Sequence, residues 1–93
     1  MGLNIILQNA AGAEVDGWDS MRHAGDREFA ALMQGYPLIK EPCGWDDEPR
    51  VRPADIPVLR AALPADGWGN PERFPGLLDW LEADPSLWVR FSY

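Results

Sequence analysis

The fold is decided by residues 66–93, which read DGWGNPERFPGLLDWLEADPSLWVRFSY. This stretch holds three of the five tryptophans of the chain. Four of its apolar side chains have the spacing of one helical face: Leu77, Leu78, Trp80 and Leu81. Pro85 ends the helix, because the residue before a proline is disfavoured in the α conformation. The sequence therefore predicts a helix that ends before Pro85 and buries these four side chains.

Beyond this helix the apolar period changes to two. The side chains expected on one face are Leu87, Val89, Phe91 and Tyr93, and those on the other are Trp88, Arg90 and Ser92. Residues 2–8 alternate in the same way at the opposite end of the chain. Each strand needs a neighbour for its backbone groups, so we expect residues 87–91 to pair with residues 3–7 in one sheet.

The segment between these strands contains turn and helix signals. Residues 9–12, Asn-Ala-Ala-Gly, have turn chemistry, and residues 13–18 are predicted to return as a second strand of a hairpin. A helix is expected next, with Asp26 as its cap and Gly35 and Pro37 at its end. Its apolar face consists of Phe29, Leu32, Met33 and Tyr36.

Residues 38–53 carry Pro42, Pro49, Pro53 and Gly44, so we expect only short extended pieces there, at residues 38–39 and 50–52. A third helix is predicted over residues 53–63. The order favours one domain, residues 1–93, of the α+β class. It would be a small two-layer domain in which an antiparallel sheet of about three strands, the N-terminal hairpin plus the C-terminal strand, is packed by about three helices.

Composition restricts the environment of the protein. The single cysteine, Cys43, excludes an internal disulfide framework and fits a reducing compartment. No basic region followed by an apolar run marks a signal peptide, and no apolar stretch approaches the roughly 20 residues that span a bilayer. We therefore expect a cytoplasmic protein that does not enter a membrane.

The net charge of −7 is unevenly placed along the chain. Residues 1–49 hold nine acidic and three basic side chains, whereas residues 50–93 hold six and five. Such a chain is expected to avoid nucleic acid and anionic membranes, and its first half is expected to attract a basic protein surface. The alternative is that the charge serves solubility alone.

A candidate partner-binding surface follows from this asymmetry. Trp45 directly precedes Asp46, Asp47 and Glu48 in the segment with the most prolines. Tryptophan is enriched among binding hot spots, and loops carry many binding residues. We therefore expect these four residues to contact a basic partner. The alternative is a solvated acidic connection.

A second candidate site is an aromatic pocket. Three Gly-Trp pairs stand at predicted loops, and their rings, Trp18, Trp45 and Trp68, are either pinned to the core or gathered around a ligand. The pocket would make the protein a small-molecule binder or an enzyme.

Signals for catalysis, metals and cofactors are weak. The acidic run lacks the alternating ligand spacing of a calcium loop. His23 and Cys43 are each solitary, and no family signature joins them as a catalytic pair. We therefore predict no catalytic residue, no metal site and no cofactor.

Both ends of the chain resemble a group of small bacterial and phage proteins for which no activity is established. The resemblance lies in the Met-Gly-Leu-Asn-Ile start, the Gly-Trp-Gly of residues 67–69, the helix of residues 74–81 and the ending of residues 84–93. It implies a compact domain encoded by a phage or prophage. Together with the charge, it suggests a non-enzymatic inhibitor of a host nuclease or defence complex, or an immunity protein.

Overall fold

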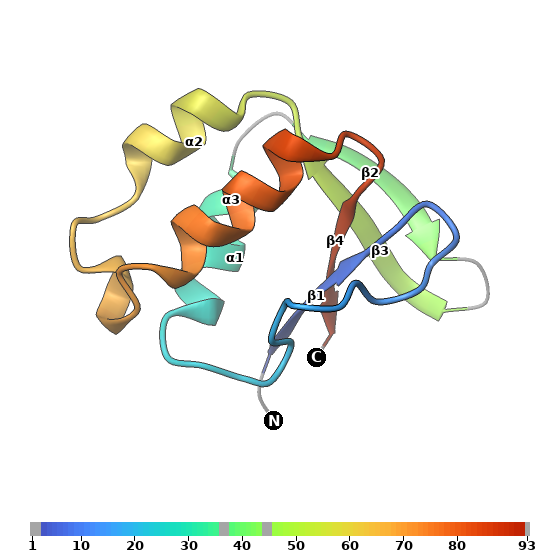
Figure 1. The fold of residues 1–93 in the computed structure, drawn as a ribbon, viewed down its shortest axis with the longest axis horizontal. Coiled ribbons are helices and arrows are strands. Elements are labelled where there is room, and N and C mark those ends of the chain that lie inside the picture. Colours follow the sequence, from blue (N-terminus) through green and yellow to red (C-terminus); the bar gives the residue numbers. More distant parts are fainter. Residues whose placement is uncertain (1–2, 36–37, 44–45, 93) are drawn as a thin grey trace.

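The sheet of this protein has four antiparallel strands in the computed structural model, which describes residues 3–35, 38–43 and 46–92 (Figure 1). For residues 38–43 and 46–49 the description covers the backbone. The strands are β1 (Asn4–Gln8), β2 (Leu38–Cys43), β3 (Asp46–Pro53) and β4 (Trp88–Ser92). Their order is β1-β4-β3-β2, so the strand that comes last in the sequence lies inside the sheet.

The predicted pairing of the two ends of the chain is confirmed. β1 and β4 are antiparallel neighbours, with Ile5 opposite Phe91 and Leu7 opposite Val89. All four side chains are buried, as the period of two requires for the face that meets the core. β4 also pairs with β3, where Val51 lies opposite Val89.

Three helices pack on one side of the sheet: α1 (Asp26–Gln34), α2 (Ile56–Ala62) and α3 (Arg73–Ala83). Figure 1 shows them gathered on the same side, with a short 3-10 turn, η1 (Gly67–Gly69), between α2 and α3. The α+β class and the two-layer arrangement are therefore confirmed. Within the described ranges, no helix is long and apolar enough to cross a membrane.

The core lies between the two layers and consists mainly of aliphatic and phenyl side chains. The largest fully buried side chains are Phe29, Phe74, Phe91, Ile5, Leu7, Met33, Leu59, Leu77, Leu78, Leu81, Val51 and Val89. Phe29 of α1 and Phe74 of α3 stack with ring centroids 4.6 Å apart. This stack joins the two helices above the sheet.

The start of α1 differs from the prediction. Its N-cap is Gly25, whose φ of 89° is favourable for glycine, and no side chain caps the helix. Asp26 is the first helical residue, and its carboxylate accepts the backbone N–H of His23 instead. At α2, by contrast, the carboxylate of Asp55 accepts the N–H of Val58, the usual capping bond.

The predicted N-terminal hairpin is wrong in its second half. The turn is present, since the N–H of Gly12 donates to the carbonyl of Asn9 and Gly12 has a φ of 89°. Residues 13–18, however, form no strand, and a single bridge joins Glu14 to Gln8. The segment still covers the outer edge of β1, because the N–H of Val15 donates to the carbonyl of Leu7. A sheet edge is thereby shielded without a fifth strand.

The proline-containing segment forms more regular structure than predicted. Instead of short pieces, β2 and β3 make a hairpin with Pro42 opposite Pro49 and an irregularity beside Cys43. An antiparallel ladder alternates between hydrogen-bonded and non-hydrogen-bonded pairs, so two prolines that face each other can share a position that needs no N–H. This hairpin supplies the additional strands, which is why the sheet exceeds the expected three.

The predicted apolar face of α3 is correct for three of its four residues. Leu77, Leu78 and Leu81 are fully buried, but Trp80 is 37% exposed. The buried stripe continues through Phe74, three residues before Leu77 and four before Leu78. Trp80 lies beside this stripe, at the boundary between the core and the surface.

Candidate functional site

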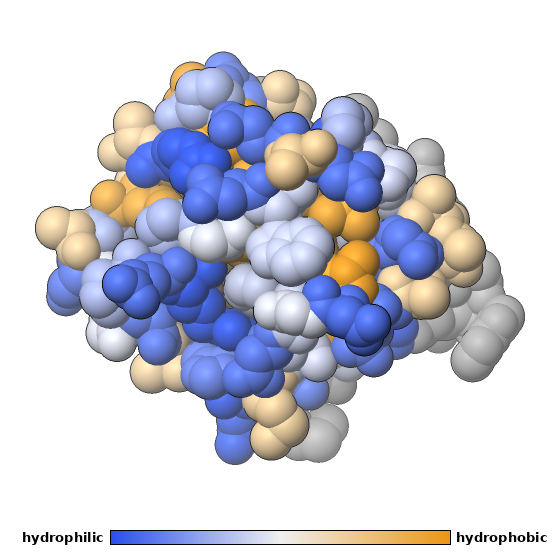
Figure 2. Space-filling view, viewed as in Figure 1, coloured by the Kyte–Doolittle hydropathy of each residue, from blue (hydrophilic) through white to orange (hydrophobic). Residues whose placement is uncertain are grey.

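An open groove lies between α3 and the segment that connects β1 to α1. Its volume is about 360 Å³, and its lining residues are Gly17, Trp18, Asp19, His23, Asn70, Glu72, Arg73, Gly76 and Trp80. In Figure 2, the centre of the face formed by these two segments has side chains of intermediate hydropathy, with mainly hydrophilic side chains to the left and below and hydrophobic side chains on its right. The groove therefore combines indole rings with a polar border.

Trp18 is fixed on one side of this groove by two contacts. Its indole N–H donates to the carbonyl of Ile5 over 2.9 Å, so a backbone acceptor at the outer edge of β1 is satisfied by a side chain. The guanidinium of Arg73 lies 4.4 Å from the ring centroid, within the range of a cation–π contact. Both contacts hold the ring half-buried and in one orientation.

Arg73 connects α3 to the segment before α1. Its Nε donates to one carboxylate oxygen of Asp26 over 2.8 Å and its Nη2 to the other over 3.2 Å. The remaining bonds are to the carbonyls of Asp19 and Met21. The side chains are only 9% exposed for Arg73 and 1% for Asp26, so each charge depends on the other for compensation.

Trp80 forms the opposite side of the groove, and the backbone of Gly17 lies against its ring. A Cβ at residue 17 would be 3.2 Å from Cζ2 of Trp80, and the φ of Gly17 is 96°. A glycine is therefore needed here for two reasons, the backbone conformation and the close approach of the indole. Trp80 is the most exposed of the rings that line the groove.

The charges around the groove are mainly negative. The N–H of Met21 and the ring of His23 hold the pKa of Asp19 below its usual value of 3.8, so Asp19 is an anion at neutral pH. Glu72 is exposed and adds a second carboxylate to the lining. The charge of Arg73 is offset by Asp26 behind the groove, and it makes only the smallest of the contributions that lower the pKa of Asp19.

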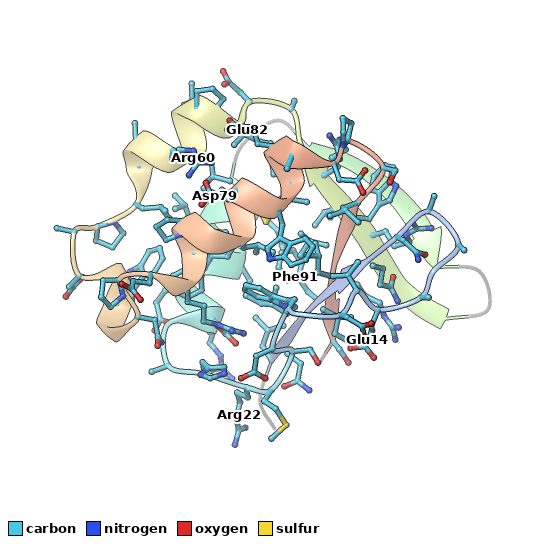
Figure 3. The ribbon with its side chains drawn as sticks, viewed as in Figure 1. Glu14, Arg22, Arg60, Asp79, Glu82 and Phe91 are labelled. Atoms are coloured by element: carbon cyan, nitrogen blue, oxygen red, sulfur yellow. The ribbon has the colours of Figure 1, made fainter. Side chains whose placement is uncertain are left out.

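The acidic residues farther along α3 are paired with α2. Arg60 lies 2.7 Å from a carboxylate oxygen of Asp79 and 3.5 Å from one of Glu82, and Figure 3 shows the three side chains together between the helices. This exposed cluster connects α2 to α3 on the side of α3 away from the groove lining. Asp19 and Glu72 therefore remain as the acids of the groove itself.

The side chains of the arginines in β3 donate hydrogen bonds to backbone carbonyls. Nη2 of Arg50 donates to the carbonyl of Asn9, and Nη1 of Arg52 donates to the carbonyl of Leu87. Arg50 also lies 5.4 Å from the ring centroid of Trp88. These bonds tie the loops at the strand ends to the sheet.

Of the three rings predicted to form an aromatic pocket, Trp18 and Trp68 are described, and they take different positions. Trp18 lines the groove, whereas the ring of Trp68 packs edge-on against Phe29 and Phe74 at centroid distances of 6.5 and 5.5 Å. Trp68 also has a φ of 55°, between two glycines of positive φ. Its role is to close the core above α1 and α3.

The predicted acidic surface is described only in part. Trp45 lies outside the described residues, and the backbone of Asp46, Asp47 and Glu48 begins β3 instead of a loop. The two solitary residues, His23 and Cys43, have separate surroundings. Nε2 of His23 lies 2.8 Å from a carboxylate oxygen of Asp19, and the backbone of Cys43 ends β2. No group of three potential metal-ligating side chains occurs among residues 3–35 and 50–92, where side chains are described.

Sequence reasoning missed the roles of Arg73, Asp26 and Trp80. The spacing of Phe74, Leu77, Leu78 and Leu81 already defines a complete apolar stripe, so Trp80 could have been recognised as a residue beside it. No local signal joins Asp26 to Arg73, which are far apart in the chain.

Comparison of the chain with protein-family models, with curated proteins and with solved structures finds no match. The site is therefore interpreted from its own geometry and charge.

Proposed function

We propose that this protein is a non-enzymatic protein-binding domain whose contact surface is the groove between Trp18 and Trp80. The observation that carries this proposal is the exposure of Trp80 beside two carboxylates in an open groove. Tryptophan is among the residue types enriched at binding hot spots, and it can contribute a large contact area to a partner surface. The acidic border favours a basic partner.

The shape and chemistry of the groove favour binding over catalysis. A site for a small molecule usually encloses most of its ligand, whereas this groove is open to solvent. No serine, threonine, cysteine or lysine occurs among the described residues that line it. The proposal is accordingly an interaction with another macromolecule.

The partner that we propose is a basic protein, such as a host nuclease, a defence complex or a toxin. The supporting facts are the net charge of −7 and the resemblance of the two ends to small phage and bacterial proteins. A nuclease site is built for a negatively charged substrate, and an acidic surface is complementary to such a site. Its place of action would be the cytoplasm.

The acidic run beside Trp45 is the second part of this proposal. Asp46, Asp47 and Glu48 are proposed to raise the rate of encounter with the basic partner, while Trp45 adds contact area. Replacing the three acids with asparagine and glutamine should lower the association rate and weaken its dependence on salt. An unchanged association rate would remove this run from the contact surface.

Affinity capture with groove variants tests the main proposal. Wild-type protein, Trp80→Ala and the control Trp88→Ala are immobilised and exposed to lysates of infected and uninfected bacteria. Trp88 alternates with buried neighbours in β4, so it faces away from the helices and from the groove. We expect a partner that is retained by wild type and Trp88→Ala and lost by Trp80→Ala. Equal retention by all folded variants would show that the groove is not the contact surface.

A further inference from the structure

We infer that the groove accepts one arginine side chain of the partner, with its guanidinium against the indole of Trp80 and between Asp19 and Glu72. This inference rests on the proposed function and specifies the chemical group that the groove recognises. It follows from three features of the described residues: the exposed ring, the local charge and an internal example of the same contact.

The exposed ring offers a suitable face for a cation. Trp80 is 37% exposed; the backbone of Gly17 lies against one part of its ring, and Gly76, the other glycine of the lining, has no side chain that would cover the rest. Indole is the aromatic group that attracts cations most strongly, and guanidinium is the cation found most often on such rings. Apolar ligands would also contact the ring, so the ring alone does not select arginine.

The local charge selects a cation. Asp19 is anionic at neutral pH, because the N–H of Met21 and the ring of His23 hold its pKa low. Glu72 is exposed, and no hydrogen bond or ion pair of its side chain occurs among the described residues, so its carboxylate is available. The guanidinium of Arg73 is compensated by Asp26, and its side chain is 9% exposed, so it presents little surface to an anion.

The groove already contains one guanidinium on an indole. Arg73 lies over Trp18 at 4.4 Å while its N–H groups bond to Asp26 and to two carbonyls. A partner arginine would repeat this arrangement on Trp80, with Asp19 and Glu72 as acceptors. Arginine is preferred to lysine, because its planar, weakly hydrated group can stack and donate in several directions at once.

Short peptides test this inference without knowledge of the partner. The probes are acetyl-Gly-Arg-Gly-amide, the lysine analogue, and the citrulline analogue, which has nearly the same shape but no charge. Binding is followed by the indole N–H signals of Trp18 and Trp80 in nitrogen-edited NMR spectra, assigned with Trp80→Ala. We expect saturable shifts with the arginine peptide and about 5- to 30-fold weaker binding of the citrulline peptide, since one cation–π contact and two surface ion pairs are lost.

Glu72→Gln is the variant that isolates the charge. It retains the shape of the side chain and removes one acceptor, so the preference for arginine over citrulline should fall several-fold while citrulline binding is unchanged. Glu82→Gln is the matched control, since Glu82 pairs with Arg60 outside the groove lining. The arginine preference of this control should equal that of wild type.

The inference is overturned if arginine and citrulline bind equally, if Glu72→Gln leaves their ratio unchanged, or if no peptide shifts the Trp80 signal at tens of millimolar. These outcomes are separate from the capture experiment. A partner that is lost by Trp80→Ala, combined with equal binding of the two peptides, would support the groove as a contact surface and reject arginine as its ligand.

Discussion

The buried ion pair between Arg73 and Asp26 should be the most sensitive polar contact in the domain. Arg73→Leu removes the guanidinium and leaves the carboxylate of Asp26, 1% exposed, with the N–H of His23 as its remaining donor. Breaking one side of a buried pair costs about 3–5 kcal/mol of unfolding free energy. A domain of this length has roughly 5–14 kcal/mol in total, so the variant should keep only part of its stability.

Urea unfolding measures this cost, with far-UV circular dichroism and tryptophan fluorescence as separate probes. Circular dichroism is needed because Arg73 lies on Trp18 and its loss changes the fluorescence directly. In a thermal scan, the same loss of unfolding free energy should lower the melting temperature by about 12–40 °C. The double variant Asp26→Leu with Arg73→Leu should lose less than the sum of the single variants, by about 1–3 kcal/mol.

Arg60→Leu is the control for this prediction. Arg60 also pairs with carboxylates, Asp79 and Glu82, but their side chains are 71% and 57% exposed. Exposed pairs contribute about 0–1 kcal/mol. If Arg73→Leu destabilised the protein no more than Arg60→Leu, burial of the ion pair would not be the source of its strength, and our interpretation of Arg73 would be wrong.

Three further predictions concern the core, the groove and the response to acid. Leu81→Ala should cost about 2–5 kcal/mol, because the side chain is fully buried, and a melting temperature within a few degrees of wild type would contradict this. Gly12→Ala should cost about 1–2 kcal/mol because of its positive φ, and Gly17→Ala should cost more, because its Cβ would also approach Trp80; only Gly17→Ala should move the NMR signal of the Trp80 indole. Two hydrogen bonds from Ser86, the stronger from its hydroxyl and the weaker from its N–H, hold the pKa of Asp84 below 3.8 in the folded state. The Asp84 carboxylate therefore stabilises the fold above its unfolded pKa, and this stabilisation is lost as the pH falls through the folded pKa. Ser86→Ala should therefore raise the pKa of Asp84 in an NMR titration, and an unchanged value would show that the hydroxyl has no such effect.

The pairing of β1 with β4 could be predicted, because the alternation of apolar residues at both ends follows directly from burial of one sheet face. The hairpin of β2 and β3 could not, because Pro42 and Pro49 count against a strand when each is considered alone. Their placement opposite each other removes the conflict, and that placement depends on the register of two segments.

The groove shows the same limit of local reasoning. Trp18 alone is consistent with a core residue, and only the tertiary arrangement of α3 and the segment before α1 half-buries it and brings it to the same groove as Trp80. The charge asymmetry between the two halves of the sequence also does not describe a surface, since Asp26 of the first half is neutralised by Arg73 of the second. Contacts between distant residues decide which charges and rings remain available.

The position of β4 between β1 and β3 has a consequence for the synthesis of the protein. While residues 1–87 are being made, β1 and the β2–β3 hairpin have no strand to join them, so the sheet cannot close until residues 88–92 have been added. Nascent chains should therefore remain protease-sensitive, with their apolar strand faces open to chaperones, until the last strand is complete. Two arrested nascent chains would test this. One ends at Pro85, and the other continues through Ser92 into a C-terminal linker long enough for Ser92 to leave the ribosome. Protection from protease in the shorter chain would contradict the prediction.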